Sequence, residues 1–263
     1  MNHILQIAAL FLAQLGFGSA LILPFFPVKV IGKAFLRYYY GFIVIMLALF
    51  LFCMYRLGQF HINYLILAGL AAWIWALSFT AKFTKLESGL MWFYAFCSLA
   101  ILFIYPQKFI FHGSSFSSYA AWFSILLLST LFINYCLMNM IFGHWYLVNN
   151  ELPISYLIKT SKVFIAITYL RVASVALVTF LAYKNMEPAQ FDRIIDFMGH
   201  GVFFWARILA GLGLPLLVAH LSFESAKIKS NQSATGILYA GLVFVLMGEI
   251  LALYLYTLTG YFF

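Results

Sequence analysis

Three ionisable side chains lie within long apolar stretches of the sequence, where a membrane would exclude an uncompensated charge. They are Arg171, Arg207 and Glu249. A charge near the bilayer centre costs about 2.5–3.5 kcal/mol on insertion scales, so it persists where a partner or a cavity compensates it. One structural Arg–Glu pair would leave one positive charge over. This surplus predicts an anionic or oxygen-rich partner such as a propionate, a phosphate, a quinone oxygen or a transported anion.

Histidines form the second group of candidates. His144 and His220 are expected at the inner ends of two spans, and His200 at the outer start of the span that contains His220. Two neutral imidazoles from different helices at one depth can hold a haem iron from both faces, and imidazole is a suitable ligand for it. We therefore predict His144 and His220 as haem iron ligands, and His200 as a further cofactor-binding residue.

The two arginines extend this cofactor hypothesis. Arg207 follows His200 by seven residues, so the two side chains lie on nearly the same helix face. An arginine beside a haem propionate would neutralise it through charge-assisted hydrogen bonds. Arg171 and Arg207 are therefore predicted to bind the cofactor, haem b or a quinone, and Glu249 is predicted on a proton or ion path.

Two other functions stay open at this point. The same three charges could line the path of a transporter or channel for a small anion. The Gly211–Pro215 stretch would loosen or kink its helix, as in broken transporter helices, or would instead permit close packing by small residues. The chain could also be a structural or assembly subunit without a cofactor. No HExxH, GxSxG or paired-carboxylate motif occurs, so no catalytic residue is predicted.

These side chains must be positioned by membrane helices. Of the 263 residues, 65% are hydrophobic and 8% are charged, whereas a soluble domain carries about 25% charged residues. The apolar runs are long and continuous, which favours helices, because a helix satisfies its own backbone in lipid. We predict an all-α polytopic transmembrane bundle of about eight spans in a single integral membrane domain, residues 1–263. The spans are expected near 4–26, 38–55, 62–80, 89–105, 118–142, 163–183, 198–222 and 235–258.

The basic residues of the loops predict the orientation of these spans. Alternate loops carry nine and four lysines and arginines, and the richer side is expected to be cytoplasmic. Both termini would then lie outside, and the protein would be a multi-pass protein of the cell (inner or plasma) membrane. The nine are Lys29, Lys33, Arg37, Lys82, Lys85, Lys159, Lys162, Lys227 and Lys229, and the four are Arg56, Lys108, Lys184 and Arg193.

The net charge of +8 points to the anionic leaflet of a bilayer rather than to nucleic acid, because the basic residues are spread over short loops. The expected partners are the lipid bilayer and other membrane subunits. Taken together, the sequence predicts an integral membrane subunit of a respiratory or electron-transfer assembly that binds haem b, a quinone or both within spans five to eight.

Overall fold

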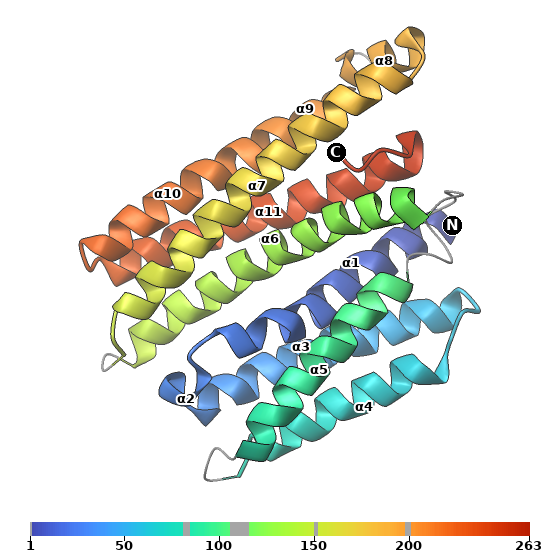
Figure 1. Cartoon of the computed structure of the whole chain (residues 1–263). Helices are drawn as coiled ribbons and strands as arrows, with labels where there is room; N and C mark the ends of the chain where they lie inside the picture. Colours follow the sequence, from blue (N-terminus) through green and yellow to red (C-terminus); the bar gives the residue numbers. More distant parts are fainter. Residues whose placement is uncertain (1, 81–84, 106–115, 150–151, 198–200) are drawn as a thin grey trace. The chain divides into compact units, whose positions relative to one another are not determined.

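Helices make up nearly all of the chain in the computed structural model (Figure 1). The structure describes residues 2–80, 85–105, 116–149, 152–197 and 201–263. Within these ranges the elements are helices and no strand occurs. The predicted all-α fold class is therefore confirmed, whereas the orientation of the termini stays a prediction.

Among the described residues, seven helices are long and apolar enough to cross a membrane. Their bounds extend several of the predicted spans, because helix continues past the apolar core into the polar flanks. The seven are α1 (Asn2–Ile22), α3 (Lys33–Arg56), α5 (Lys85–Ile104), α6 (Phe116–Val148), α7 (Ser155–Asn185), the continuous Gly201–Lys227 segment and α11 (Asn231–Thr259).

The predicted span at 62–80 gives a helix shorter than the other seven. It forms α4 (Ile62–Leu77), an apolar helix of 16 residues. At 1.5 Å per residue such a helix reaches about 24 Å, less than the hydrocarbon thickness of about 30 Å. The helix ends where Lys33 Nζ donates to the carbonyl oxygen of Leu77 at 3.3 Å and forms an ion pair with Glu87 at 2.7 Å. Lys33, paired with the buried carboxylate of Glu87, therefore links the end of α4 to the start of α5.

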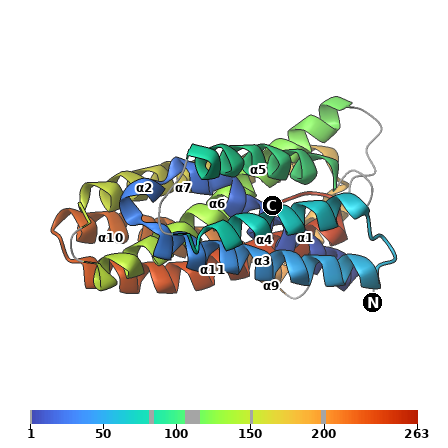
Figure 2. The same cartoon turned by 90° about the horizontal axis from the view of Figure 1, so that it is seen from below.

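Two compact units make up the chain, Met1–Tyr119 and Ala120–Phe263. In the first unit α1 packs against α3 and α5, and α4 packs against the same two helices (Figures 1 and 2). The short elements η1 (Leu23–Phe25) and α2 (Val28–Ile31) connect α1 to α3. That the whole chain acts as a single membrane domain stays a prediction.

The second unit contains all three intramembrane charges. α11 packs against α9 (Gly201–Ile208), η3 (Leu209–Gly213) and α10 (Leu214–Lys227), and α10 also packs against α7. Side chains of α6 reach both α7 and α11, since Phe132 stacks on Phe164 and Trp122 packs on Tyr256.

A short helix occupies part of the expected outer loop at 184–197. This is α8 (Pro188–Ile195), whose proline stands in its first turn, where the missing N–H is not needed. The sequence analysis missed α8, because eight amphipathic residues between two long apolar runs resemble an ordinary loop. The helix matters for the site, because it packs beside the start of α9.

Candidate functional site

The three intramembrane charges meet in one buried cluster. Glu249 on α11 accepts hydrogen bonds from Arg171 on α7, with Oε1 to Nε at 3.0 Å and Oε2 to Nη2 at 2.9 Å. Arg207 on α9 donates from Nη2 to the same carboxylate at 2.8 Å, and Ser129 on α6 donates at 2.6 Å. Both arginines and Glu249 are completely buried. The cluster therefore ties together four helices, through charge-assisted bonds that are stronger than neutral ones.

Two glycines allow this arrangement. A Cβ atom on Gly211 would lie 2.6 Å from the Cα atom of Gly248, and one on Gly248 would lie 2.4 Å from the Cα atom of Gly211. Neither contact is sterically possible, so only two glycines let η3 and α11 approach so closely. Gly248 directly precedes Glu249, and Gly211 is one helical turn beyond Arg207. The close crossing thus brings the carboxylate within reach of the guanidinium.

Arg207 also supplies a hydrogen-bond donor that Pro215 cannot supply to the backbone of this helix. In an α-helix the carbonyl oxygen of Gly211 would accept from the backbone N–H of residue 215, but Pro215 has none. The helix widens into a π-helix at Leu209–Gly213, and Arg207 Nη1 donates to the Gly211 oxygen at 3.1 Å. The predicted loosening at Gly211–Pro215 is confirmed. Such π-helical turns occur frequently at functional sites.

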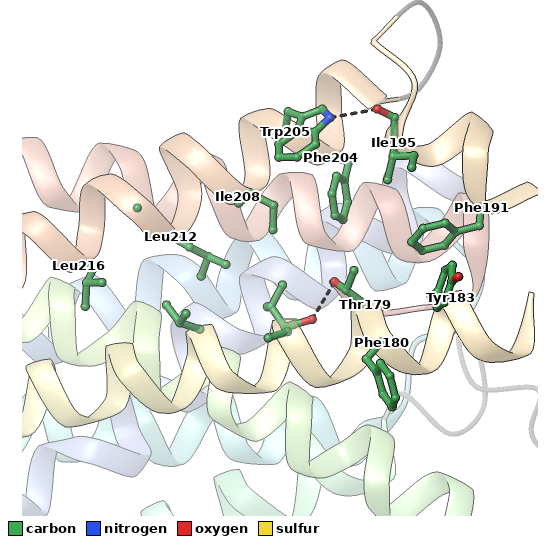
Figure 3. Close-up of a pocket in the computed structure, with 14 residues that line it drawn as sticks. Thr179, Phe180, Tyr183, Phe191, Ile195, Phe204, Trp205, Ile208, Leu212 and Leu216 are labelled. Carbon is green, nitrogen blue, oxygen red and sulfur yellow. Dashed lines mark hydrogen bonds between the residues drawn. The ribbon is translucent and has the colours of Figure 1, made fainter.

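An apolar groove lies beside the π-helix. It has a volume of about 750 Å³ and runs between α7 on one side and α9, η3 and α10 on the other, with α8 contributing at one end (Figure 3). This volume is within the usual range for small-molecule sites. Five aromatic side chains line the groove, together with aliphatic ones: Phe180, Tyr183, Phe191, Phe204 and Trp205.

Two polar groups in the groove are already engaged within the chain. Trp205 donates from Nε1 to the carbonyl oxygen of Ile195 at 3.0 Å, and Thr179 donates to that of Val175 at 2.8 Å (Figure 3). Tyr183 adds a hydroxyl on a side chain that is 66% exposed. The groove is therefore suited to a flat or chain-like apolar ligand.

The predicted histidine ligands have different neighbours. The exposed ring of His144, on α6, packs edge-on against Tyr239 of α11, with ring centroids 6.3 Å apart. His220, on α10, has Nδ1 2.9 Å from the carbonyl oxygen of Leu216 and Nε2 3.2 Å from the hydroxyl of Tyr169 on α7. Because a carbonyl only accepts, Nδ1 carries the proton, and in the neutral ring Nε2 accepts from Tyr169.

Iron ligation by His220 would therefore require the Tyr169 hydroxyl to move away from Nε2. The ring of His144 contacts α11, whereas the ring of His220 contacts α7. Haem ligation by His144 and His220 stays a prediction. His200 lies outside the described residues. The described residues contain no group of three or more His, Cys, Asp or Glu side chains arranged to hold a metal ion.

If the haem hypothesis is correct, the dithionite-reduced spectrum of the purified protein shows the α-band of haem b. His220→Ala should then remove that band, whereas His61→Ala, at the exposed start of α4, should retain it. A spectrum without the band would contradict the haem hypothesis. It would not test whether the groove binds a ligand.

Sequence reasoning had identified the charges of the site but missed three of its parts. Ser129, the main-chain oxygen of Phe263 and the aromatic groove were not predicted. A single serine in a span gives little signal. The groove residues resemble lipid-facing side chains until the helices are placed side by side.

The fold and the site define an α-helical multi-pass membrane protein with a buried ionic cluster and an adjacent apolar groove. No protein-family model, curated protein or solved structure matches the chain.

Proposed function

We propose that the protein is an integral membrane subunit of an electron-transfer assembly and that it binds a quinone in the groove between α7 and α9–α10. The observation that carries this proposal is the combination of volume and lining, about 750 Å³ bounded by aliphatic and aromatic side chains. Aromatic rings stack favourably on flat rings in offset or edge-on geometry. A benzoquinone or naphthoquinone head has the shape that such a lining accepts.

The location of the groove within the helices supports the same ligand class. α7 and the Gly201–Lys227 segment are both membrane-crossing by length and composition. A ligand that dissolves in hydrocarbon can reach such a groove directly from the bilayer. Quinones with an isoprenoid tail are dissolved there. Redox partners would be other membrane subunits in the cell membrane, as the sequence analysis predicts.

Filling the groove is expected to abolish quinone binding. Ala176 lines the groove on α7, and Ala176→Trp would place an indole in it. We expect photolabelling by an azidoquinone to fall about tenfold or more, because an added ring displaces the ligand from its contacts. Labelled peptides in the wild-type protein should map to α7, α9 and α10. The measurement is mass spectrometry of the labelled protein in lipid nanodiscs.

Ala173→Trp is the matched control. Ala173 is on the same helix and exposed, and it is not among the residues that line the groove. Its labelling should equal that of the wild-type protein. Equal labelling of both variants, or wild-type labels on helices far from the groove, would contradict the proposal.

A structural role is the second candidate, and the ionic cluster favours it. The Glu249 carboxylate bonds to both guanidinium groups and to Ser129, and the three charged side chains are fully buried. This closed arrangement favours a clamp between helices over a solvated anion path. A wild-type protein that takes up no azidoquinone label at all would make the structural role the better explanation.

A further inference from the structure

The groove between α7 and α9–α10 has two ends with different side chains (Figure 3). It extends along α7 from Val172 to Tyr183, which is about 16 Å at 1.5 Å per residue. The end beside α8, here called the aromatic end, is lined by Phe180, Tyr183, Phe191, Phe204 and Trp205. The other end, here called the aliphatic end, is lined by Val172, Leu212, Gly213 and Leu216. A long ligand with two unlike ends can therefore bind in two directions that are not equivalent.

The aromatic end lies where the helices become polar. α7 ends two residues beyond Tyr183, and Nζ of Lys184 is 4.8 Å from the centroid of the Phe180 ring. Exposed charged residues follow on α8. The aliphatic end, by contrast, lies in the middle of α7 and of the Gly201–Lys227 segment, which are both long enough to cross a membrane. The aromatic end therefore faces the interface of a bilayer, and the aliphatic end faces its hydrocarbon.

Tyr183 supplies a hydrogen-bond donor at the aromatic end. Its ring packs edge-on against that of Phe191, with centroids 5.4 Å apart. Its hydroxyl has no hydrogen-bond partner among the residues that the structure describes, whereas Trp205 and Thr179 use their donors within the chain. A hydroxyl can donate to a quinone carbonyl, which only accepts. The aromatic end thus offers a donor to a headgroup, and the side chains of the aliphatic end contain no polar group.

We infer that the groove binds its quinone in one direction, with the headgroup at the aromatic end and the tail along the aliphatic end. Tyr183 Oη then donates to a carbonyl oxygen of the headgroup, whose ring packs against Phe191 and Trp205. This inference rests on the proposed quinone function and specifies the orientation of the ligand. It makes Tyr183 the residue that distinguishes a quinone headgroup from an apolar ring.

The two directions differ in free energy. In the reversed direction the carbonyl oxygens would lie among aliphatic side chains, where a polar group without a partner is destabilising. The apolar tail would then lie at the interface and would lose contact with hydrocarbon. The reversed ligand is therefore expected to make up about a tenth or less of the bound population.

Two photoreactive quinones test the direction. One carries an azide on the headgroup ring and the other a diazirine at the end of a decyl tail, and each is crosslinked to the full-length protein in lipid nanodiscs. Only labels that excess decylubiquinone suppresses are counted. Mass spectrometry should place the ring label near Tyr183, Phe191 and Trp205, and the tail label near Leu212 and Leu216. The ratio of the two labels should differ about tenfold or more between the two ends.

Tyr183→Phe tests the donor. The change removes only the hydroxyl group, so the ring contact with Phe191 is retained. Decylubiquinone and decylbenzene share a tail, but only decylubiquinone carries carbonyl oxygens, and each competes with the photolabel. The apparent Kd of decylubiquinone should rise about fivefold, because one hydrogen bond is lost. That of decylbenzene should change less than about twofold.

Tyr55→Phe is the matched control. Tyr55 lies near the end of α3, is 72% exposed and does not line the groove, whereas Tyr183 is 66% exposed. Both ligands should bind this variant as they bind the wild-type protein.

The outcomes separate the inference from the function on which it rests. Ring and tail labels in the reverse positions, or both labels on the same peptides, would overturn the inference while the groove remained a quinone site. An unchanged Kd of decylubiquinone in Tyr183→Phe, or an equal rise for decylbenzene, would overturn it as well. If neither probe labels the wild-type protein, the proposed function fails together with the inference.

Discussion

Glu249→Gln is expected to lower the free energy of unfolding by about 3–5 kcal/mol, because removal of one partner leaves buried charges uncompensated. Glu249 carries the only negative charge in contact with Arg171 and Arg207 in the cluster as the structure describes it, and all three side chains are completely buried. The neutral amide would keep the size of the side chain. It would also turn one acceptor atom into a donor that faces a guanidinium group.

The measurement is the melting temperature and the fraction of monodisperse protein in detergent micelles. Glu224→Gln is the control, since Glu224 pairs with Lys227 on the surface of α10 and its side chain is 60% exposed. Exposed pairs contribute little, so this variant should lie within about 1 kcal/mol of the wild-type protein. A Glu249→Gln protein as stable as Glu224→Gln would show that the cluster does not clamp the helices.

Replacing all three charges together distinguishes charge from packing. Exchanging a buried ionic network for apolar side chains of similar size is often neutral or stabilising. Arg171→Leu, Arg207→Leu and Glu249→Leu in one chain should therefore be more stable than Glu249→Gln alone. The gain will be incomplete, because the carbonyl oxygen of Gly211 would lose its donor.

Gly248→Ala is expected to be the next most damaging change, with a loss of about 3 kcal/mol or more in the free energy of unfolding. The new Cβ would lie 2.4 Å from the Cα atom of Gly211 and 2.9 Å from Nη1 of Arg207. Backbone atoms cannot rotate away, so α11 must separate from η3. That separation would lengthen the bond from Arg207 to Glu249, which depends on the close crossing.

Gly236→Ala on the same helix is the matched control. A Cβ atom there meets nothing within 4 Å. Alanine favours helix over glycine by about 1 kcal/mol, so this variant should be neutral or slightly stabilised in a thermal melt. Similar losses at positions 236 and 248 would indicate that helix propensity, rather than the crossing, determines the result.

Membrane topology could be predicted from the sequence because it depends on local composition. A continuous apolar run of about twenty residues forms a helix in lipid wherever it occurs, since its backbone has no other partner there. Seven of the predicted spans are helices of sufficient length and apolarity. The remaining predicted span forms the shorter helix α4, which ends at Leu77. The carbonyl oxygen of Leu77 accepts from Lys33 on α3, and that contact joins residues 44 positions apart.

The charged residues of the site show the same difference between what the sequence predicts and what depends on helix packing. Arg171, Arg207 and Glu249 stood out in the sequence because any charge in an apolar run must be compensated. The two small residues beside them, Gly211 and Gly248, were also visible as residues. Their role in the close approach of η3 and α11 could not be predicted, because the sequence alone does not determine which helices cross.

By itself, then, the sequence determined that the chain is an all-α membrane protein and that three intramembrane charges need partners. Those conclusions follow from the cost of moving each side chain into hydrocarbon, which is a property of the residue and its neighbours along the chain. Only the tertiary structure decided that Glu249 pairs with both arginines, that the main-chain oxygen of Phe263 accepts from both, and that an aromatic groove lies between α7 and α9–α10. These features depend on contacts between residues up to 120 positions apart, and such contacts are set by how helices pack.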